Sequence, residues 1–232
     1  MDYSGKLAMY VRSIGQELHI LRHILNAYRR LSANAYEHKF HRALLAAIKP
    51  GDNVWDVGAN TGLYTELFAD AVGPDGKVIA FEPSPKAFAI LKSLAVKKNN
   101  IFLQNVALSD TEGLLDFFVN QQELSTTDGL MPASDHTEPI KVTVKRGDAF
   151  IPLASPSIIK IDVEGFELEV LNGMQQTLAM ASLRAIFVEV HFLVLKKKGM
   201  PRAPSTIAKI LHDNEFKVSW TDPSHICASR KN

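Results

Sequence analysis

The feature that most constrains this chain is an apolar run, carrying an acid near its end, that passes at once into a glycine-rich turn. Residues 53–57 are typical of a strand, residues 58–62 of a tight turn, and residues 63–72 of a helix. Gly58 can adopt a positive φ, and Gly62 is expected to let the helix pack close against the strand. Such a strand–turn–helix unit directs unpaired backbone N–H groups toward the mouth of a ligand cleft.

Asp56, within this strand, indicates which class of ligand the cleft takes. A dinucleotide-binding fold uses the turn to hold pyrophosphate, and a carboxylate at this position would repel it. A cationic ligand would be attracted, and S-adenosylmethionine carries both a sulfonium and an ammonium group. The turn therefore favours methyl transfer over the hydride transfer of a nicotinamide dehydrogenase, the first alternative on a similar fold.

The chain after Pro50 alternates strand-like and helix-like segments. We expect strands at 53–57, 77–82, 101–107, 157–163 and 184–191, and helices at 62–72, 85–98, 166–180 and 203–213. This alternation predicts an α/β domain over residues 50–232, with a mainly parallel, Rossmann-like sheet and helices on both faces. Two further β-like segments are 114–119 and 140–144, and the chain closes with an expected hairpin of 216–220 and 225–229. The lysine run 196–198 is expected in a loop.

The first 49 residues predict a helical extension or cap. Apolar residues recur at helical spacing over 6–32, and a second helix is expected over 36–49, stopped by Pro50. This arm has eight Lys or Arg against three Asp or Glu. It is interpreted as a cap on the main domain or a contact in a homodimer, and alternatively as a basic amphipathic helix that binds a membrane surface or a carrier protein.

Composition places the chain among ordinary globular enzymes. Its 232 residues carry a formal net charge of +1, so nothing in the overall charge favours nucleic acid as a partner. Cys227 is the single cysteine, which excludes an intramolecular disulfide and a cysteine-rich zinc site. No apolar segment approaches the roughly 20 residues of a transmembrane helix, and no secretory signal is recognised. We expect a cytoplasmic enzyme.

The residues that follow each predicted strand are the candidates for chemistry, because ligands of such sheets bind at the carboxyl ends of the strands. Glu82 lies about 20 residues beyond the glycine turn, the spacing of a carboxylate that binds ribose hydroxyls. Asp162 and Glu164 follow one strand, and Glu189 and His191 end the next. Spaced two apart, each pair could face one cleft and serve in proton abstraction or bind a divalent metal.

In combination and order these motifs resemble the FkbM family of S-adenosylmethionine-dependent methyltransferases. The motifs are Asp56-Val57-Gly58-Ala59-Asn60-Thr61-Gly62, Phe81-Glu82-Pro83, Lys160-Ile161-Asp162-Val163-Glu164-Gly165 and Glu189-Val190-His191. Tyr36-Glu37 is similar to a pair that such proteins often carry before the first strand. The resemblance implies a class I methyltransferase fold, with a seven-stranded sheet and an antiparallel hairpin at one end. It implies O-methylation of a hydroxyl on a sugar, secondary metabolite or other small molecule or glycan.

Carried over by position, the resemblance assigns a role to several residues. Gly58, Asn60 and Gly62 would line the methionine moiety, and Glu82 would hold the ribose. Asp56 and Glu37 would neutralise the ammonium group, and the segment 105–107 would border the adenine. The residues expected around the cofactor are thus Tyr36, Glu37, Asp56, Gly58, Ala59, Asn60, Thr61, Gly62, Tyr64, Thr65, Glu82, Pro83, Ser84, Asn105, Val106, Ala107 and Asp162. Ser125 and Thr126 fall where the family often has a substrate loop, although they depart from its commoner Ser-Ser pattern.

The expected reaction is an in-line attack of a hydroxyl oxygen on the sulfonium methyl group. Because an alkyl hydroxyl is a poor nucleophile at neutral pH, a base or a metal must help remove its proton. His191 or Asp162 is the expected base, oriented by Glu164 and Glu189, and any metal is expected at Asp162 and Glu189. Two alternatives remain: methylation of a nitrogen or a macromolecular acceptor, and a non-enzymatic assembly module that kept the fold.

Overall fold

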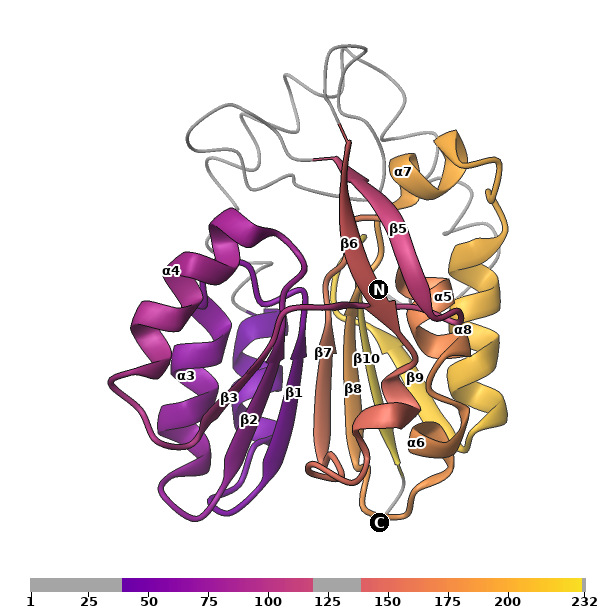
Figure 1. Ribbon diagram of the computed structural model, residues 1–232. Helices are drawn as coiled ribbons and strands as arrows, with labels where there is room; N and C mark the ends of the chain where they lie inside the picture. Colours follow the sequence, from indigo (N-terminus) through magenta and orange to yellow (C-terminus); the bar gives the residue numbers. More distant parts are fainter. Residues whose placement is uncertain (1–38, 119–138, 231–232) are drawn as a thin grey trace, which may run out of the picture.

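The fold is a mainly parallel sheet with helices on both faces (Figure 1). The computed structural model describes residues 39–118 and 139–230. Its main sheet has seven strands in the order β3-β2-β1-β7-β8-β10-β9, in which β10 runs antiparallel to both of its neighbours. The strands are β1 (Asn53–Val57), β2 (Lys77–Phe81), β3 (Ile101–Gln104), β7 (Ile158–Ile161), β8 (Ala185–Glu189), β9 (Phe216–Trp220) and β10 (His225–Arg230). The predicted parallel core and terminal hairpin are confirmed.

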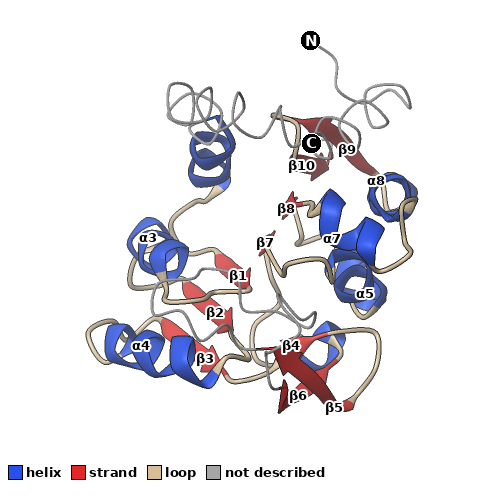
Figure 2. Cartoon of the chain, turned by 90° about the horizontal axis from the view of Figure 1, so that it is seen from above, coloured by secondary structure: helices blue, strands red, loops and turns tan. Residues whose placement is uncertain are grey.

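Helices cover the two faces of this sheet, as the view from above shows (Figure 2). One face carries the helix of residues 39–47 with α3 and α4, and the other carries α5 and α8. The labelled helices are α3 (Leu63–Val72), α4 (Pro85–Ala95), α5 (Glu167–Asn172), α6 (Gln175–Ala179), α7 (Phe192–Lys197) and α8 (Ala203–Asp213). Among the described residues, no helix has both the length and the apolar character that crossing a bilayer requires.

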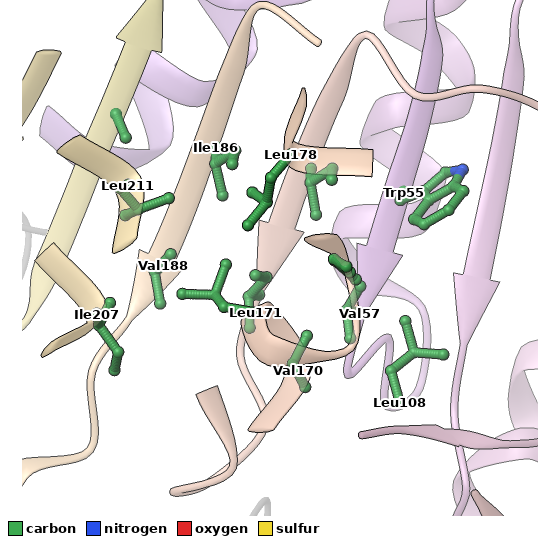
Figure 3. Close-up of a cluster of buried hydrophobic side chains, with 14 of the residues drawn as sticks. Trp55, Val57, Leu108, Val170, Leu171, Leu178, Ile186, Val188, Ile207 and Leu211 are labelled. Atoms are coloured by element: carbon green, nitrogen blue, oxygen red, sulfur yellow. The ribbon is translucent and has the colours of Figure 1, made fainter. Parts of the chain in front are cut away.

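The core follows the two-residue alternation of the strands. Trp55 and Ile186 face α5 and α8, where they join a buried cluster with Leu171 and Leu211 (Figure 3). The intervening positions face the other way, and Phe187 packs there against Phe40 of the helix 39–47, with ring centroids 5.8 Å apart. The described end of the N-terminal extension is therefore packed on the main sheet. The predicted helix over 6–32 lies outside the described residues.

A second, three-stranded sheet of order β4-β6-β5 lies beside the main one. Its strands are β4 (Ala107–Leu108), β5 (Gly113–Phe118) and β6 (Pro139–Lys145). The prediction of one strand over 101–107 was wrong, because the chain leaves the main sheet after Gln104 and re-enters pairing in the small sheet. The β-like segments predicted at 114–119 and 140–144 correspond to β5 and β6.

Three further differences from the predicted elements have local causes. The helix expected over 166–180 is divided into α5 and α6 at Gly173, whose backbone lies so close to Ser109 that a Cβ atom would be 2.0 Å from the Ser109 carbonyl oxygen. Residues 192–197 form α7 where a loop was expected. A Cβ on Gly62 would meet Leu91 and Leu94 of α4, so this glycine allows packing against α4 rather than against β1.

Candidate active site

The turn after β1 is held by the carboxylate of Glu82, which follows β2. Glu82 Oε2 accepts a hydrogen bond from the backbone N–H of Asn60, and Oε1 accepts one from that of Ser84, both at 2.7 Å. Gly58 has a φ of +79°, and a Cβ atom there would lie 1.8 Å from the carbonyl oxygen of Asp162. The turn therefore contacts the chain after β7 directly, an approach that only glycine permits.

These segments surround a cavity of about 360 Å³ at the carboxyl ends of β1, β2, β7 and β8. This is the edge at which ligands of doubly wound sheets bind. Most of the predicted site residues line it: Gly58, Ala59, Asn60, Thr61, Tyr64, Glu82, Pro83, Ser84, Val106, Ala107, Asp162, Glu164, Glu189 and His191. Leu108 and Phe117 of the small sheet add apolar surface near Val106 and Ala107. Asn105 points elsewhere, since its side-chain amide donates to the carbonyl oxygens of Glu82 and Pro83 at 2.8 and 3.3 Å.

Asp56 lies behind the cavity rather than in its lining. Its carboxylate is fully buried, accepts a hydrogen bond from Thr65 Oγ1 at 2.6 Å, and lies 3.4 Å from Lys160 Nζ. Lys160 stands directly opposite Asp56 in the parallel pairing of β1 with β7, and its Nζ is also 3.4 Å from Asp162. The sequence predicted direct contact of Asp56 and Thr65 with the cofactor. In the structure the nearby Lys160 lines the cavity, and Asp56 compensates its charge.

Lys160 keeps its proton despite its burial. Burial lowers the pKa of Lys160, but the charges of Asp162 and Asp56 outweigh this effect and raise it above the ordinary lysine value. Its Nζ also lies 4.9 Å from the ring centroid of Tyr64, a cation–π distance. Two carboxylates therefore lie beside this buried ammonium group, Asp56 behind the cavity and Asp162 in its lining.

A cluster of acids around one histidine forms another part of the lining. His191, just after β8, places Nδ1 2.7 Å from Oε1 of Glu167, a fully buried acid at the start of α5. Its Nε2 lies 3.3 Å from Glu164 Oε2, 3.8 Å from Asp162 Oδ1 and 3.9 Å from Glu189 Oε1. The two predicted pairs thus meet in one cluster. They do so although β7 ends at Ile161 and Glu164 adopts a φ of +50°, so the extended geometry that was expected to align Asp162 with Glu164 does not persist.

The cluster changes the protonation of its members. Burial lowers the pKa of His191, but the hydrogen bond to Glu167 and the charges of Glu167, Glu164 and Glu189 outweigh it and raise the pKa to about 10. Burial raises the pKa of Glu164 to about 7, with the nearby acids adding to this effect and His191 opposing it. Burial also raises the pKa of Glu189, but a hydrogen bond and charge from His225, with His191 and Lys160, outweigh it and lower the pKa to about 2. His191 is therefore an imidazolium at neutral pH, and Glu189 is a carboxylate.

A comparison with models of protein families identifies the family of the chain. The model of the FkbM methyltransferase domain matches residues 56–218, which contain the end of β1, all of β2, β7 and β8, and every acid of the cluster. The chain belongs to the FkbM methyltransferase family. It is therefore an enzyme of the S-adenosylmethionine-dependent methyltransferases, as the sequence motifs predicted.

Several characterised methyltransferases of this family resemble the chain at low identity. It is 29% identical over 193 residues to the hexuronic acid methyltransferase AglP of Haloferax volcanii, which covers 76% of this chain and 74% of AglP. It is 31% identical over 176 residues to the 31-O-demethyl-FK506 methyltransferase FkbM of Streptomyces tacrolimicus, covering 62% and 67%. It is 27% identical over 181 residues to the 2-O-methyltransferase NoeI of Sinorhizobium fredii, covering 70% and 73%.

Some predicted FkbM-family site residues lie outside the described part of the chain. These are Tyr36 and Glu37, expected near the cofactor, and Ser125 and Thr126, expected in the substrate loop. Within the described part, sequence reasoning missed Glu167 and Lys160 as members of the site. A signal for Glu167 was present, because it is the third carboxylate within six residues after β7. Lys160 could be found only from the register of β7 against β1.

One group in the described part of the chain has the composition of a metal site. Asp162, Glu164 and His191 each offer a ligand atom, and these atoms lie within 4.8 Å of one another. The sequence predicted Asp162 and Glu189 for any metal, whereas the geometry groups Asp162 with Glu164 and His191. Carboxylate oxygens and an imidazole nitrogen could together hold a divalent cation.

Proposed function

We propose that this enzyme transfers the methyl group of S-adenosylmethionine to a hydroxyl of a small molecule or sugar. The observation that carries the proposal is one cavity lined both by Glu82 with the glycine turn and by the acid–histidine cluster. This provides a place for the donor and, beside it, groups that handle the proton of an acceptor. AglP, FkbM and NoeI are named for a hexuronic acid, 31-O-demethyl-FK506 and a 2-O-position, which supports an oxygen acceptor.

In this proposal the donor lies along the turn. Glu82 lines the cavity, and its carboxylate, anchored by the backbone N–H groups of Asn60 and Ser84, suits the hydroxyls of the ribose. The apolar surface of Val106, Ala107 and Leu108 suits the adenine ring. Asp162 lines the cavity beside Lys160, whose charge Asp56 compensates, so the Asp162 carboxylate suits the ammonium and sulfonium groups.

We infer that Glu164 accepts the acceptor's proton, in place of His191 or Asp162. His191 faces carboxylates through both ring nitrogens, and a histidine in that setting is held as an imidazolium that cannot accept a further proton. Glu164 lines the cavity, and its Oε2 lies 3.3 Å from His191 Nε2, so the imidazolium orients the carboxylate. Alignment of donor and acceptor is the other large contribution, worth roughly 7–11 kcal/mol when geometry is near ideal.

The test is methyl transfer from isotopically labelled S-adenosylmethionine to a panel of sugars, hydroxylated metabolites, carboxylic acids, amines and nucleic acid. We expect turnover with a hydroxyl compound. Glu164→Gln should lower kcat by roughly 10²–10⁴-fold, the usual contribution of a general base, while the affinity for S-adenosylhomocysteine is retained. Glu112→Gln, at an exposed acid, is the matched control and should retain full activity. Turnover with amines alone would overturn the oxygen acceptor, and turnover with carboxylic acids or nucleic acid alone would overturn the hydroxyl of a small molecule or sugar. Full activity of Glu164→Gln would overturn the base.

A divalent cation at Asp162, Glu164 and His191 is the second way to activate the hydroxyl. The same assay distinguishes the two. If a cation is needed, treatment with a chelator should abolish turnover, and added Mg²⁺ or Mn²⁺ should restore it. If Glu164 acts alone, chelation should leave the rate unchanged. Pairing of two copies through the N-terminal helix and a cytoplasmic location stay predictions from the sequence.

A further inference from the structure

We propose that His225 and Asp222, at the turn between β9 and β10, position the Glu189 carboxylate in the cavity. The inference rests on the proposed function, because it concerns the acceptor end of the same site. His225 and Asp222 lie outside the cavity lining, and neither belongs to the acid–histidine cluster itself. They are positioning residues, which act on the reaction only through Glu189.

The strand pairing brings His225 to Glu189. The two residues stand directly opposite each other in the antiparallel pairing of β10 with β8, so their side chains share one face of the sheet. His225 Nε2 lies 3.4 Å from Glu189 Oε2. The terminal hairpin therefore has a contact with the site that follows from register alone.

Asp222 fixes the other side of the His225 ring. Its Oδ1 lies 2.7 Å from His225 Nδ1 and accepts hydrogen bonds from the backbone N–H groups of Ser224 and His225 at 2.9 and 3.0 Å. Asp222 is 3% exposed, and Thr221 Oγ1 donates to its second oxygen at 3.2 Å. An acid anchored by this many donors has one orientation, and the imidazole bound to it is oriented as well.

The surroundings keep His225 in this place. The Phe40 ring of the helix 39–47 packs on the imidazole, with centroids 4.2 Å apart, and His225 is 9% exposed. A buried imidazole with one carboxylate at each nitrogen satisfies both of its N–H groups, whereas a single partner would leave one group buried and unpaired. Glu189 is thus the second partner that this histidine requires.

The consequence lies in the cavity. With Oε2 of Glu189 directed to His225, Oε1 is directed toward His191, 3.9 Å from its Nε2. Glu189 therefore adds negative charge beside the imidazolium at a fixed distance. Packing and hydrogen bonds outside a cavity hold the side chains of the site in the geometry that the reaction requires. A displacement of such a side chain by about 1 Å can slow the reaction by about 10²-fold.

Two variants of His225 distinguish a role in positioning Glu189 from a role in packing alone. His225→Phe keeps a ring beneath Phe40 but removes both N–H donors, and His225→Gln keeps two N–H donors on one nitrogen. The measurement is a crystal structure of each variant, with and without S-adenosylhomocysteine, together with kcat on an acceptor from the panel. His212→Phe is the matched control, since His212 lies beside Asp213 on α8 with its side chain 82% exposed.

In His225→Phe we expect Glu189 to adopt another rotamer and kcat to fall by roughly 10²-fold, the cost of a displacement of about 1 Å. The affinity for S-adenosylhomocysteine should be unchanged, and His225→Gln should recover most of kcat and the original rotamer. An unmoved Glu189 in His225→Phe, or equal losses in both variants, would overturn the inference. If the wild type neither binds S-adenosylhomocysteine nor turns over, the proposed function fails. The Glu189 rotamer in the unliganded crystals would then still decide the positioning.

Discussion

Replacement of Gly58 by alanine tests the contact between the turn after β1 and the chain after β7. At this position the backbone has a φ of +79°, and a Cβ atom would lie 1.8 Å from the Asp162 carbonyl oxygen. Gly51 provides a matched control, because its φ is +84° and no atom lies within 4 Å of its would-be Cβ. Both substitutions impose the same backbone strain, and only Gly58→Ala adds a collision.

The expected costs follow from these geometries. Alanine in the left-handed region costs roughly 1–2 kcal/mol of backbone strain, which lowers the free energy of unfolding of both Gly51→Ala and Gly58→Ala. Replacing glycine by alanine also lowers the conformational entropy of the unfolded chain, which stabilises the folded state by about 0.4–1 kcal/mol. This stabilisation is the same for both variants, so it cancels when they are compared. Forcing the turn away from Asp162 adds about 1–3 kcal/mol of overpacking. Gly58→Ala should therefore be the less stable variant by about that difference.

The assay is urea denaturation of both variants, followed by titration calorimetry with S-adenosylhomocysteine. Because relief of the collision moves Asp162, which lines the cavity, Gly58→Ala should also bind the ligand more weakly, whereas Gly51→Ala should bind as the wild type does. Equal unfolding free energies for the two variants, with equal ligand affinities, would refute the reasoning. They would mean that the turn and the chain after β7 are not in contact.

Three further predictions concern single side chains. Glu82→Gln should weaken S-adenosylhomocysteine binding by about 10–100-fold, because hydrogen bonds to a charged group are worth about 1.5–3 kcal/mol. If calorimetry gives this variant the affinity of the wild type, the prediction is wrong. Lys160→Met should destabilise the fold by about 3–5 kcal/mol by leaving the buried Asp56 carboxylate without its opposite charge, and Asp56→Asn in the same chain should recover most of the loss in urea denaturation. Burial lowers the pKa of His225, but Asp222 and Glu189 outweigh it and raise the pKa from 6.5 to about 9. The stability that His225 contributes is then fully present below pH 6.5 and lost as pH rises through about 9, so the difference in Tm from His225→Gln should shrink over that interval. A difference that stays constant would contradict it.

The sequence was sufficient to predict the parts of the fold that depend on local pattern. The alternation of strand-like and helix-like segments predicted the parallel sheet, and the acids after the strands predicted several of the residues that line the cavity. These inferences work because a strand's carboxyl end carries its next residues to one known edge of the sheet. Element ends were less predictable, and α7 was missed because its six residues include a lysine run that favours a loop.

What the sequence could not supply was the pairing of residues on different strands. Asp56 was interpreted as a contact for a cationic ligand, but the register of β1 against β7 places Lys160 opposite it. In the same way, the histidine chosen as base faces Glu167 across 24 positions of the chain, and this partner is the reason that we propose Glu164 as the base. Charge compensation depends on three-dimensional neighbours, so roles inferred from residue type alone change once the neighbours are known.

Titration calorimetry of the wild-type chain with S-adenosylhomocysteine tests the central claim most directly. If the cavity at the ends of β1, β2, β7 and β8 holds the methyl donor, the product should bind at one site per chain, and NAD should give no binding heat. Binding of NAD with no binding of S-adenosylhomocysteine would contradict the account.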